Sequence, residues 1–178
     1  MKKILIFLCI ISGLVMSGCT STQISRSSQQ QVFNACSSWG VMPLTNYTQT
    51  PQAGEKAAAI AAGLLRTCNI RQVVVYRRPG SCKTILACPH QQLSNHQIRL
   101  WARRKRLRYV MLGSVNEWRY KVGLDGEPAV NLTLNILDVH TGKIVWNSVG
   151  SEVGGSRGSV GVVAHDLINN MLSGLVLR

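Results

Sequence analysis

Residues 129–149 read AVNLTLNILDVHTGKIVWNSV, and this stretch predicts the core of the fold. Its first half alternates apolar residues with Asn and Thr, a period of two that is typical of a strand with one buried face. The tetrapeptide HTGK then makes a tight connection, and KIVWNSV returns as the partner strand. The stretch therefore predicts an antiparallel hairpin. Its buried face is expected to carry Val130, Leu132, Leu134 and Ile136.

The segments on either side of the hairpin extend it. Residues 108–120 (RYVMLGSVNEWRY) predict a long strand, joined to the hairpin by a turn at Leu124-Asp125-Gly126. From Ser159 onward, apolar residues recur at spacings of three and four, which predicts an amphipathic helix. The C-terminal part of the chain is thus expected to be an antiparallel meander closed by a helix.

Upstream, helical and strand patterns alternate. Thr50 is expected to cap a helix that begins at Pro51, and Asn69 is expected to follow its end. The expected elements are a strand over 39–47, an Ala-rich helix to about 67, a strand over 72–76 and a helix over 94–105. The resulting order, β-α-β-α-β-β-β-α, predicts an α+β sandwich with an antiparallel C-terminal meander, formed by a single domain over residues 32–178.

The N-terminus has the layout of a bacterial lipoprotein signal. Two lysines precede the apolar residues 4–15, and Ser17-Gly18-Cys19 places small residues before a cysteine. The apolar run is shorter than the about 20 residues that a transmembrane helix needs. We expect residues 1–18 to be a cleaved signal peptide and Cys19 to carry N-acyl and S-diacylglycerol lipid, with no other cofactor. Thr20 after the cysteine implies the periplasmic face of the outer membrane.

Residues 19–31 are expected to hold the lipid and a short flexible tether, because SRSSQQQ is polar and rich in Ser and Gln. At about a dozen residues, this tether would reach at most about 40 Å when fully extended.

The charge balance predicts a partner that is negatively charged. The chain has 20 Lys and Arg against 7 Asp and Glu, but no nucleic-acid-binding motif. A dense cluster surrounds Trp101 near the end of the second helix, and helix capping explains only some of its cations. Two interpretations stay open for this cluster, contact with lipid headgroups or a subunit interface. Its members are Arg103, Arg104, Lys105 and Arg106.

Four cysteines besides Cys19 belong to the expected domain, and in an oxidising compartment they predict two disulfides. The pairing that we expect is Cys82 with Cys88, within one loop, and Cys36 with Cys68. A zinc site built from Cys82, Cys88, His90 and His96 is the alternative. Five residues separate Cys82 from Cys88. The first two ligands of a usual zinc site are closer together in sequence, and this disfavours metal.

No catalytic pattern is visible in the sequence. The seven carboxylates include no recognisable acid–base pair, no His lies in a nucleophile or metal motif, and Gly-x-Ser-x-Gly does not occur. The sequence therefore predicts a protein that is not an enzyme.

Three segments carry a resemblance. Residues 39–46 (WGVMPLTN), with the Ala-rich helix after them, and residues 138–146 (DVHTGKIVW) are similar to the TolB N-terminal-like and LpoB-like periplasmic lipoproteins. Residues 120–130 (YKVGLDGEPAV) resemble the PelC family, the outer-membrane lipoproteins of Pel exopolysaccharide secretion.

The PelC resemblance implies a ring of identical subunits that guides a polysaccharide to an outer-membrane β-barrel/TPR export protein. It implies that Asp125 and Glu127 face the lumen, where repeated carboxylates would attract a cationic amino-sugar polymer. One departure is Gly154-Gly155 before Ser156-Arg157, where the family pattern has an aromatic residue. The alternative is an LpoB-like activator of a peptidoglycan synthase, for which the expected tether is short.

Overall fold

The computed structural model describes residues 20–27, 31–77, 93–123 and 126–178, and these form one mixed sheet with three helices and a small second sheet. The elements in chain order are β1 (Ser21–Arg26), β2 (Val32–Phe33), β3 (Ser38–Val41), β4 (Thr45–Asn46), α2 (Ala53–Thr67), β5 (Gln72–Val75), α3 (Asn95–Arg104), β6 (Tyr109–Tyr120), β7 (Pro128–Asp138), β8 (Ile144–Val153), α4 (Val160–Leu172) and β9 (Val176–Leu177).

The predicted hairpin and meander are confirmed. The main sheet runs β1-β8-β7-β6-β3-β5, with β4 beside β6, and β6, β7 and β8 are antiparallel neighbours. β3 pairs in parallel with both β5 and β6. The alternating apolar residues of β7 are fully buried, as the period of two requires. The expected α+β order is present, with β1, β2, β4 and β9 added to it.

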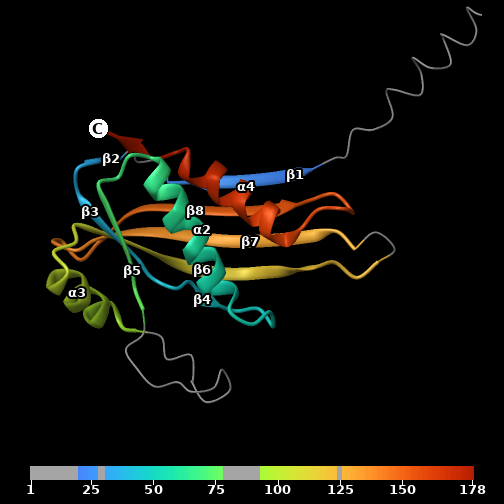
Figure 1. The fold of residues 1–178 in the computed structure, drawn as a ribbon, viewed down its shortest axis with the longest axis horizontal. Coiled ribbons are helices and arrows are strands. Elements are labelled where there is room, and N and C mark those ends of the chain that lie inside the picture. The colour runs from blue at the N-terminus through green and yellow to red at the C-terminus, as the bar shows by residue number, and fades with distance from the viewer. Residues whose placement is uncertain (1–19, 28–30, 78–92, 124–125) are drawn as a thin grey trace, which may run out of the picture.

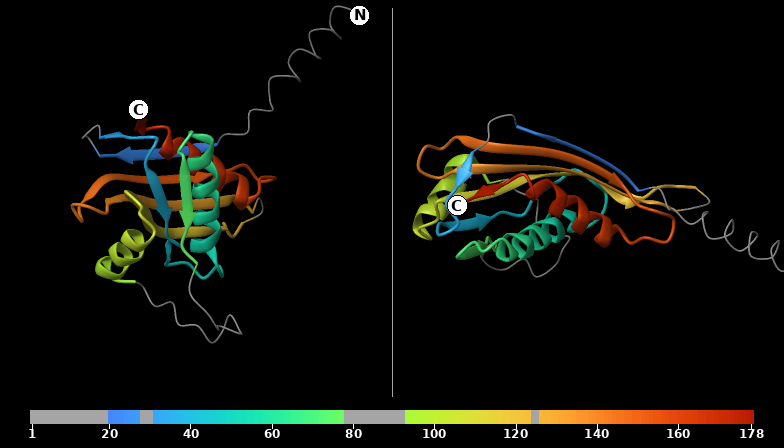
Figure 2. Two further views of the ribbon diagram at one scale, coloured as in Figure 1. Left: turned by 60° about the vertical axis from the view of Figure 1, so that its left-hand side comes forward. Right: turned by 90° about the horizontal axis from the view of Figure 1, so that it is seen from above.

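The two faces of the sheet are covered differently. Figure 1 shows α2 and α4 crossing one face, and they enclose the larger hydrophobic core with the inward residues of β6, β7 and β8. Viewed from above, the sheet forms one layer and these helices the next (Figure 2). α3 packs against the opposite face through a second cluster that includes Ile98, Ala102 and Val110. The rest of that opposite face carries the Asn and Thr residues of β7.

The start of α2 differs from the expectation. The helix begins at Ala53, and its N-cap is Gln52, in the left-handed region with φ 60° and no side-chain cap. The Thr50 hydroxyl does not cap the helix because it donates to the Trp118 carbonyl oxygen on β6, at 2.5 Å. Asn69, also at φ 60°, follows the end of the helix as expected.

The prediction of a flexible tether is wrong for residues 21–26. This segment is β1, which pairs with β8 from Ser21↔Val153 to Arg26↔Ser148. β8 would otherwise present an unpaired edge of N–H and C=O groups, and β1 satisfies it. Ile24 adds an apolar contact to the main core. Residues 1–19, with the expected signal peptide and Cys19, lie outside the described residues.

The predicted disulfide between Cys36 and Cys68 is also wrong, because both thiols are free. Each backbone is held by a local contact instead. The Cys36 N–H donates to the Asn34 side-chain oxygen at 2.8 Å, and the Cys68 N–H donates to the Leu64 carbonyl at the end of α2. Cys82, Cys88 and His90 lie outside the described residues, so the pairing of Cys82 with Cys88 stays a prediction.

Candidate functional site

Strand register places the N-terminal segment and the predicted lumen loop at the same end of the sheet. Val153 of β8 lies opposite both Ser21 and Ala129. Ser21 is two residues after Cys19, and Ala129 is two residues after Glu127. The expected anchor and the expected acidic loop therefore lead into β1 and β7, the two strands that flank β8, at the same end of the sheet.

The described stem of this loop is closed by the backbone. The Lys121 N–H donates to the Glu127 carbonyl at 2.7 Å, and this hydrogen bond joins the two ends of the loop between β6 and β7. Glu127 is half-buried. Val122 is 97% exposed, so this loop carries an apolar side chain in full contact with solvent. Asp125 lies outside the described residues.

The basic cluster lies at the opposite end. Ser94 and Gln97 form a reciprocal capping box that starts α3, and the four cations at its C-terminal end are exposed. From Tyr109, which begins β6 beside this cluster, to Arg119 is ten residues, or about 33 Å along the strand. The cations are thus separated from the anchor end by most of the length of the sheet.

Trp101 is held by the fold instead of being presented with these cations. Its ring makes an edge-on contact with Tyr76, with centroids 5.3 Å apart, and covers the position where a side chain on Gly40 would lie. Arg108 is also occupied, because it pairs at 2.8 Å with the buried Asp138. Asp138 accepts in turn from the N–H groups of His140 and Thr141, which forms the hairpin turn. This network is the physical reason for Asp at the end of β7.

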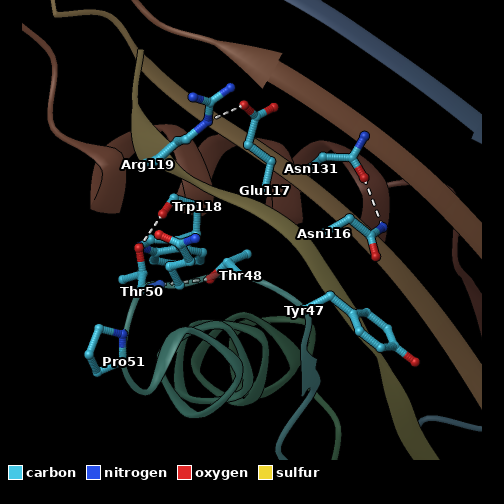
Figure 3. Close-up of a pocket in the computed structure, with 10 residues that line it drawn as sticks. Tyr47, Thr48, Thr50, Pro51, Asn116, Glu117, Trp118, Arg119 and Asn131 are labelled. Atoms are coloured by element: carbon cyan, nitrogen blue, oxygen red, sulfur yellow. Dashed lines mark hydrogen bonds and ion pairs between the residues drawn. The ribbon is translucent and has the colours of Figure 1, made fainter. Parts of the chain in front are cut away.

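An open trough of about 870 Å³ lies beside β6, near the anchor end. Its volume falls within the range of about 300–1,000 Å³ that is usual for ligand sites. Figure 3 shows the segment 47–51 forming one wall and β6 the other. The lining residues are Tyr47, Thr48, Gln49, Thr50, Pro51, Asn116, Glu117, Trp118, Arg119 and Asn131.

A β-bulge shapes the β6 wall of the trough. The pairing of β6 with β7 shifts between Val115 and Glu117, and Val115 and Trp118 both stay in the main core. The extra residue turns Asn116 and Glu117 outward together. The sequence did not predict this site, although the polar pair Asn116-Glu117 interrupts an apolar run and was a signal for it.

Glu152 is the one buried carboxylate among the described residues that has no cation paired with it. It is 4% exposed, and its Oε2 atom has no hydrogen-bond partner among the described residues. Desolvation raises the pKa of Glu152 above its ordinary value of 4.5; a hydrogen bond with the Thr22 side chain lowers it in part, and the charge of Asp166 raises it. Burial thus makes the charged form of Glu152 less favourable than that of a free carboxyl group.

Replacing Glu152 with Gln should therefore raise stability at neutral pH. Because the folded pKa is raised, the folded state binds more protons, and the wild type loses stability as pH rises from 4.5 through the raised pKa. Urea unfolding at pH 7 should show a higher midpoint for Glu152→Gln, and the difference should vanish near pH 4. Glu55→Gln, at an exposed site on α2, makes the same charge change and is the control; it should not raise the midpoint at pH 7. Equal midpoints for Glu152→Gln and wild type at pH 7 would contradict the buried-acid assignment.

The described residues contain no cluster of three or more His, Cys, Asp or Glu side chains arranged to hold a metal ion. Among the same residues, no helix has both the length and the apolar character needed to cross a membrane.

Comparison with known proteins identifies the family. No family model and no curated protein matches the chain. Among solved structures, a PelC dodecamer from Paraburkholderia phytofirmans is 34% identical, with a TM-score of 0.74, over 89% of this chain and all of the other. A second PelC dodecamer from that organism, a variant in another space group, is 35% identical over the same shares, with a TM-score of 0.73. The LpoB C-terminal domain from Escherichia coli is 18% identical over 65% of this chain and 82% of the other, with a TM-score of 0.41, too distant to carry an argument.

The fold thus defines an α+β domain with a mostly antiparallel sheet, the class to which the PelC structures belong. Within that class, sequence identity of 34% over the whole length of a PelC chain identifies one family, and the chain belongs to the PelC family.

Proposed function

We propose that this protein is a non-enzymatic outer-membrane lipoprotein whose subunits form a periplasmic ring that guides a secreted exopolysaccharide to its export channel. The observation that carries the proposal is the similarity to PelC over the full length of that chain, in structures that are dodecamers. The proposal needs no covalent chemistry, and it assigns the work to surfaces repeated around a symmetric assembly.

The two ends of the sheet have separate roles in this proposal. The anchor and the acidic loop share one end, so Asp125 and Glu127 are held close to the membrane and face the polymer. The basic cluster is about 33 Å away along β6. With the strands running along the membrane normal, it is too distant to touch the lipid headgroups at the anchor end. We therefore assign Arg103, Arg104, Lys105 and Arg106 to contact with a neighbouring subunit or the export protein. We assign no membrane contact to Trp101.

The alternative function, LpoB-like activation of a peptidoglycan synthase, is less well supported. An activator anchored in the outer membrane must reach across the periplasm, which requires a long tether. Here the folded sheet begins at Ser21, directly after the expected anchor, so the domain is held at the membrane. This is shorter still than the dozen-residue tether expected from the sequence.

Replacing Asp125 with Asn tests the proposal. Loss of one carboxylate per subunit, multiplied around the ring, should reduce polymer export at least several-fold, while native mass measurement of the full-length protein in detergent should still show a closed oligomer. Asp166→Asn makes the same charge change on the exposed face of α4 and should leave export unchanged. Export at the wild-type level in Asp125→Asn would remove the role of the loop, and a monomeric mass for the wild type would remove the ring.

A further inference from the structure

The trough beside β6 has the features of a saccharide site, and neither the PelC comparison nor the sequence analysis assigns it a ligand. It lies on the acidic loop's side of the sheet, because Arg119 at its upper edge pairs with Ala129, two residues from Glu127. We propose that the trough binds a neutral, N-acetylated amino-sugar unit of the exported polymer. This inference rests on the proposed export function and names one part of the polymer that the protein contacts.

Tyr47 provides an exposed aromatic platform. Its side chain is 68% exposed, yet its backbone N–H donates to the Val115 carbonyl at 2.9 Å, which attaches it to β6. A pyranose ring has faces of C–H groups that pack on an aromatic ring, while the phenol hydroxyl stays available for hydrogen bonds. Figure 3 shows the Tyr47 side chain extending outward at one end of the trough.

The wall that carries this platform is rigid. The Asn46 Oδ1 atom accepts from the Thr48 N–H at 2.9 Å and from the Thr48 hydroxyl at 2.7 Å, and the Asn46 amide donates to the Thr50 carbonyl at 2.8 Å. The hydrogen bond from Thr50 to Trp118 attaches the far end of the segment to β6. A binding wall that is already ordered loses little conformational entropy when a ligand binds.

The opposite wall offers fixed donors and acceptors. The Asn116 amide donates to the Asn131 Oδ1 atom at 2.9 Å, which directs the Asn131 amide N–H groups away from that contact. Arg119 Nε donates to Glu117 Oε1 at 2.8 Å, so a carboxylate and a guanidinium lie side by side (Figure 3). Amide, carboxylate and guanidinium groups together match the hydroxyl and acetamido groups of a sugar.

Charge decides between an acetylated and a free amino sugar. The ten lining residues include one carboxylate and one guanidinium, which are paired with each other, so the trough is neutral. It belongs to a chain with a formal charge of +13. An ammonium group entering the trough would meet Arg119 and would find the Glu117 charge already compensated. The neutral acetamido group avoids that repulsion, and we assign free amines to the acidic loop instead.

Isothermal titration of the full-length lipidated protein in detergent tests the proposal with three hexasaccharide probes. These are N-acetylchitohexaose, its fully deacetylated form and maltohexaose. We expect the acetylated probe to bind best, at least several-fold more tightly than either of the others. Tyr47→Ala and Asn131→Ala should each weaken its binding about tenfold or more. Tyr120→Ala, a second exposed tyrosine outside the trough lining, is the matched control and should bind as the wild type does.

Each other outcome overturns the proposal. Preference for the deacetylated probe would show that the trough recognises positive charge. If Tyr47→Ala bound the acetylated probe as tightly as the wild type does, Tyr47 would not be a binding platform. If Tyr47→Ala dissociates the oligomer but keeps its saccharide affinity, the trough is a contact between copies of this chain. The assay is independent of the proposed export function, because an intact ring with Asp125-dependent export and no saccharide binding would remove this inference alone.

Discussion

Replacing Gly54 with Ala should strongly destabilise the fold. Gly54 lies in the first turn of α2, where a Cβ atom would sit 1.9 Å from the Leu44 carbonyl oxygen and 2.9 Å from the carbonyl carbon. Both atoms belong to the backbone, so no side-chain rotation relieves the clash. The Leu44 N–H also donates to the Gly54 carbonyl at 3.2 Å, which ties the two segments together.

The cost should be about 3 kcal/mol or more, at the upper end for overpacking, because α2 must move away from the segment between β3 and β4 that contains Leu44. Total stabilities of about 5–15 kcal/mol make this a large fraction. Urea unfolding followed by circular dichroism would measure the effect. A variant with wild-type stability would show that α2 does not approach residue 44 this closely.

Gly63→Ala is the matched control because it lies in the same helix, is exposed and has no atom within 4 Å of its Cβ position. There the alanine only removes the intrinsic cost of glycine in a helix, so stability should rise by about 0.5–1 kcal/mol. Opposite effects from the same substitution, nine residues apart, would separate close backbone approach from helix propensity.

Much of the fold could be predicted because its signals are local. The alternation in β7, the HTGK turn and the spacing in α4 each lie within one short segment, and all were confirmed. Segment 21–26 was misread because its side chains are mostly polar, and its strand form depends on the free edge of β8, more than a hundred residues later. No local pattern encodes such a partner.

The trough was missed for a related reason. Its first wall reaches β6 through the pairing of Thr45 and Asn46 with Ser114 and Val115, which brings together segments about seventy residues apart. Thr50, read from sequence as a helix cap, is instead a support for that wall. The loop 121–127, in contrast, was singled out from one continuous motif in the sequence, and the roles of Asp125 and Glu127 stay a prediction.

The expected anchor gives the last prediction. Replacing Cys19 with Ser should move essentially all of the protein from the membrane fraction to the soluble periplasmic fraction, because each buried CH₂ group of an acyl chain contributes about 0.8 kcal/mol and several chains are lost. The fold should be unchanged, since the paired sheet begins at Ser21. Cys36→Ser, which removes an exposed free thiol from the folded domain, is the control and should stay in the membrane.

The same variant separates anchoring from assembly. If the short connection from Cys19 to β1 orients the domain on the membrane, Cys19→Ser should lose export even when it still forms closed oligomers. A ring without anchors loses the avidity that orients it on the membrane. Inserting a flexible glycine–serine linker between Thr20 and Ser21 should keep the membrane fraction but weaken export, since orientation then depends on the linker. Full export by the linker variant would mean that the lipid only retains the ring at the membrane. Membrane retention of Cys19→Ser would place the anchor elsewhere in the chain.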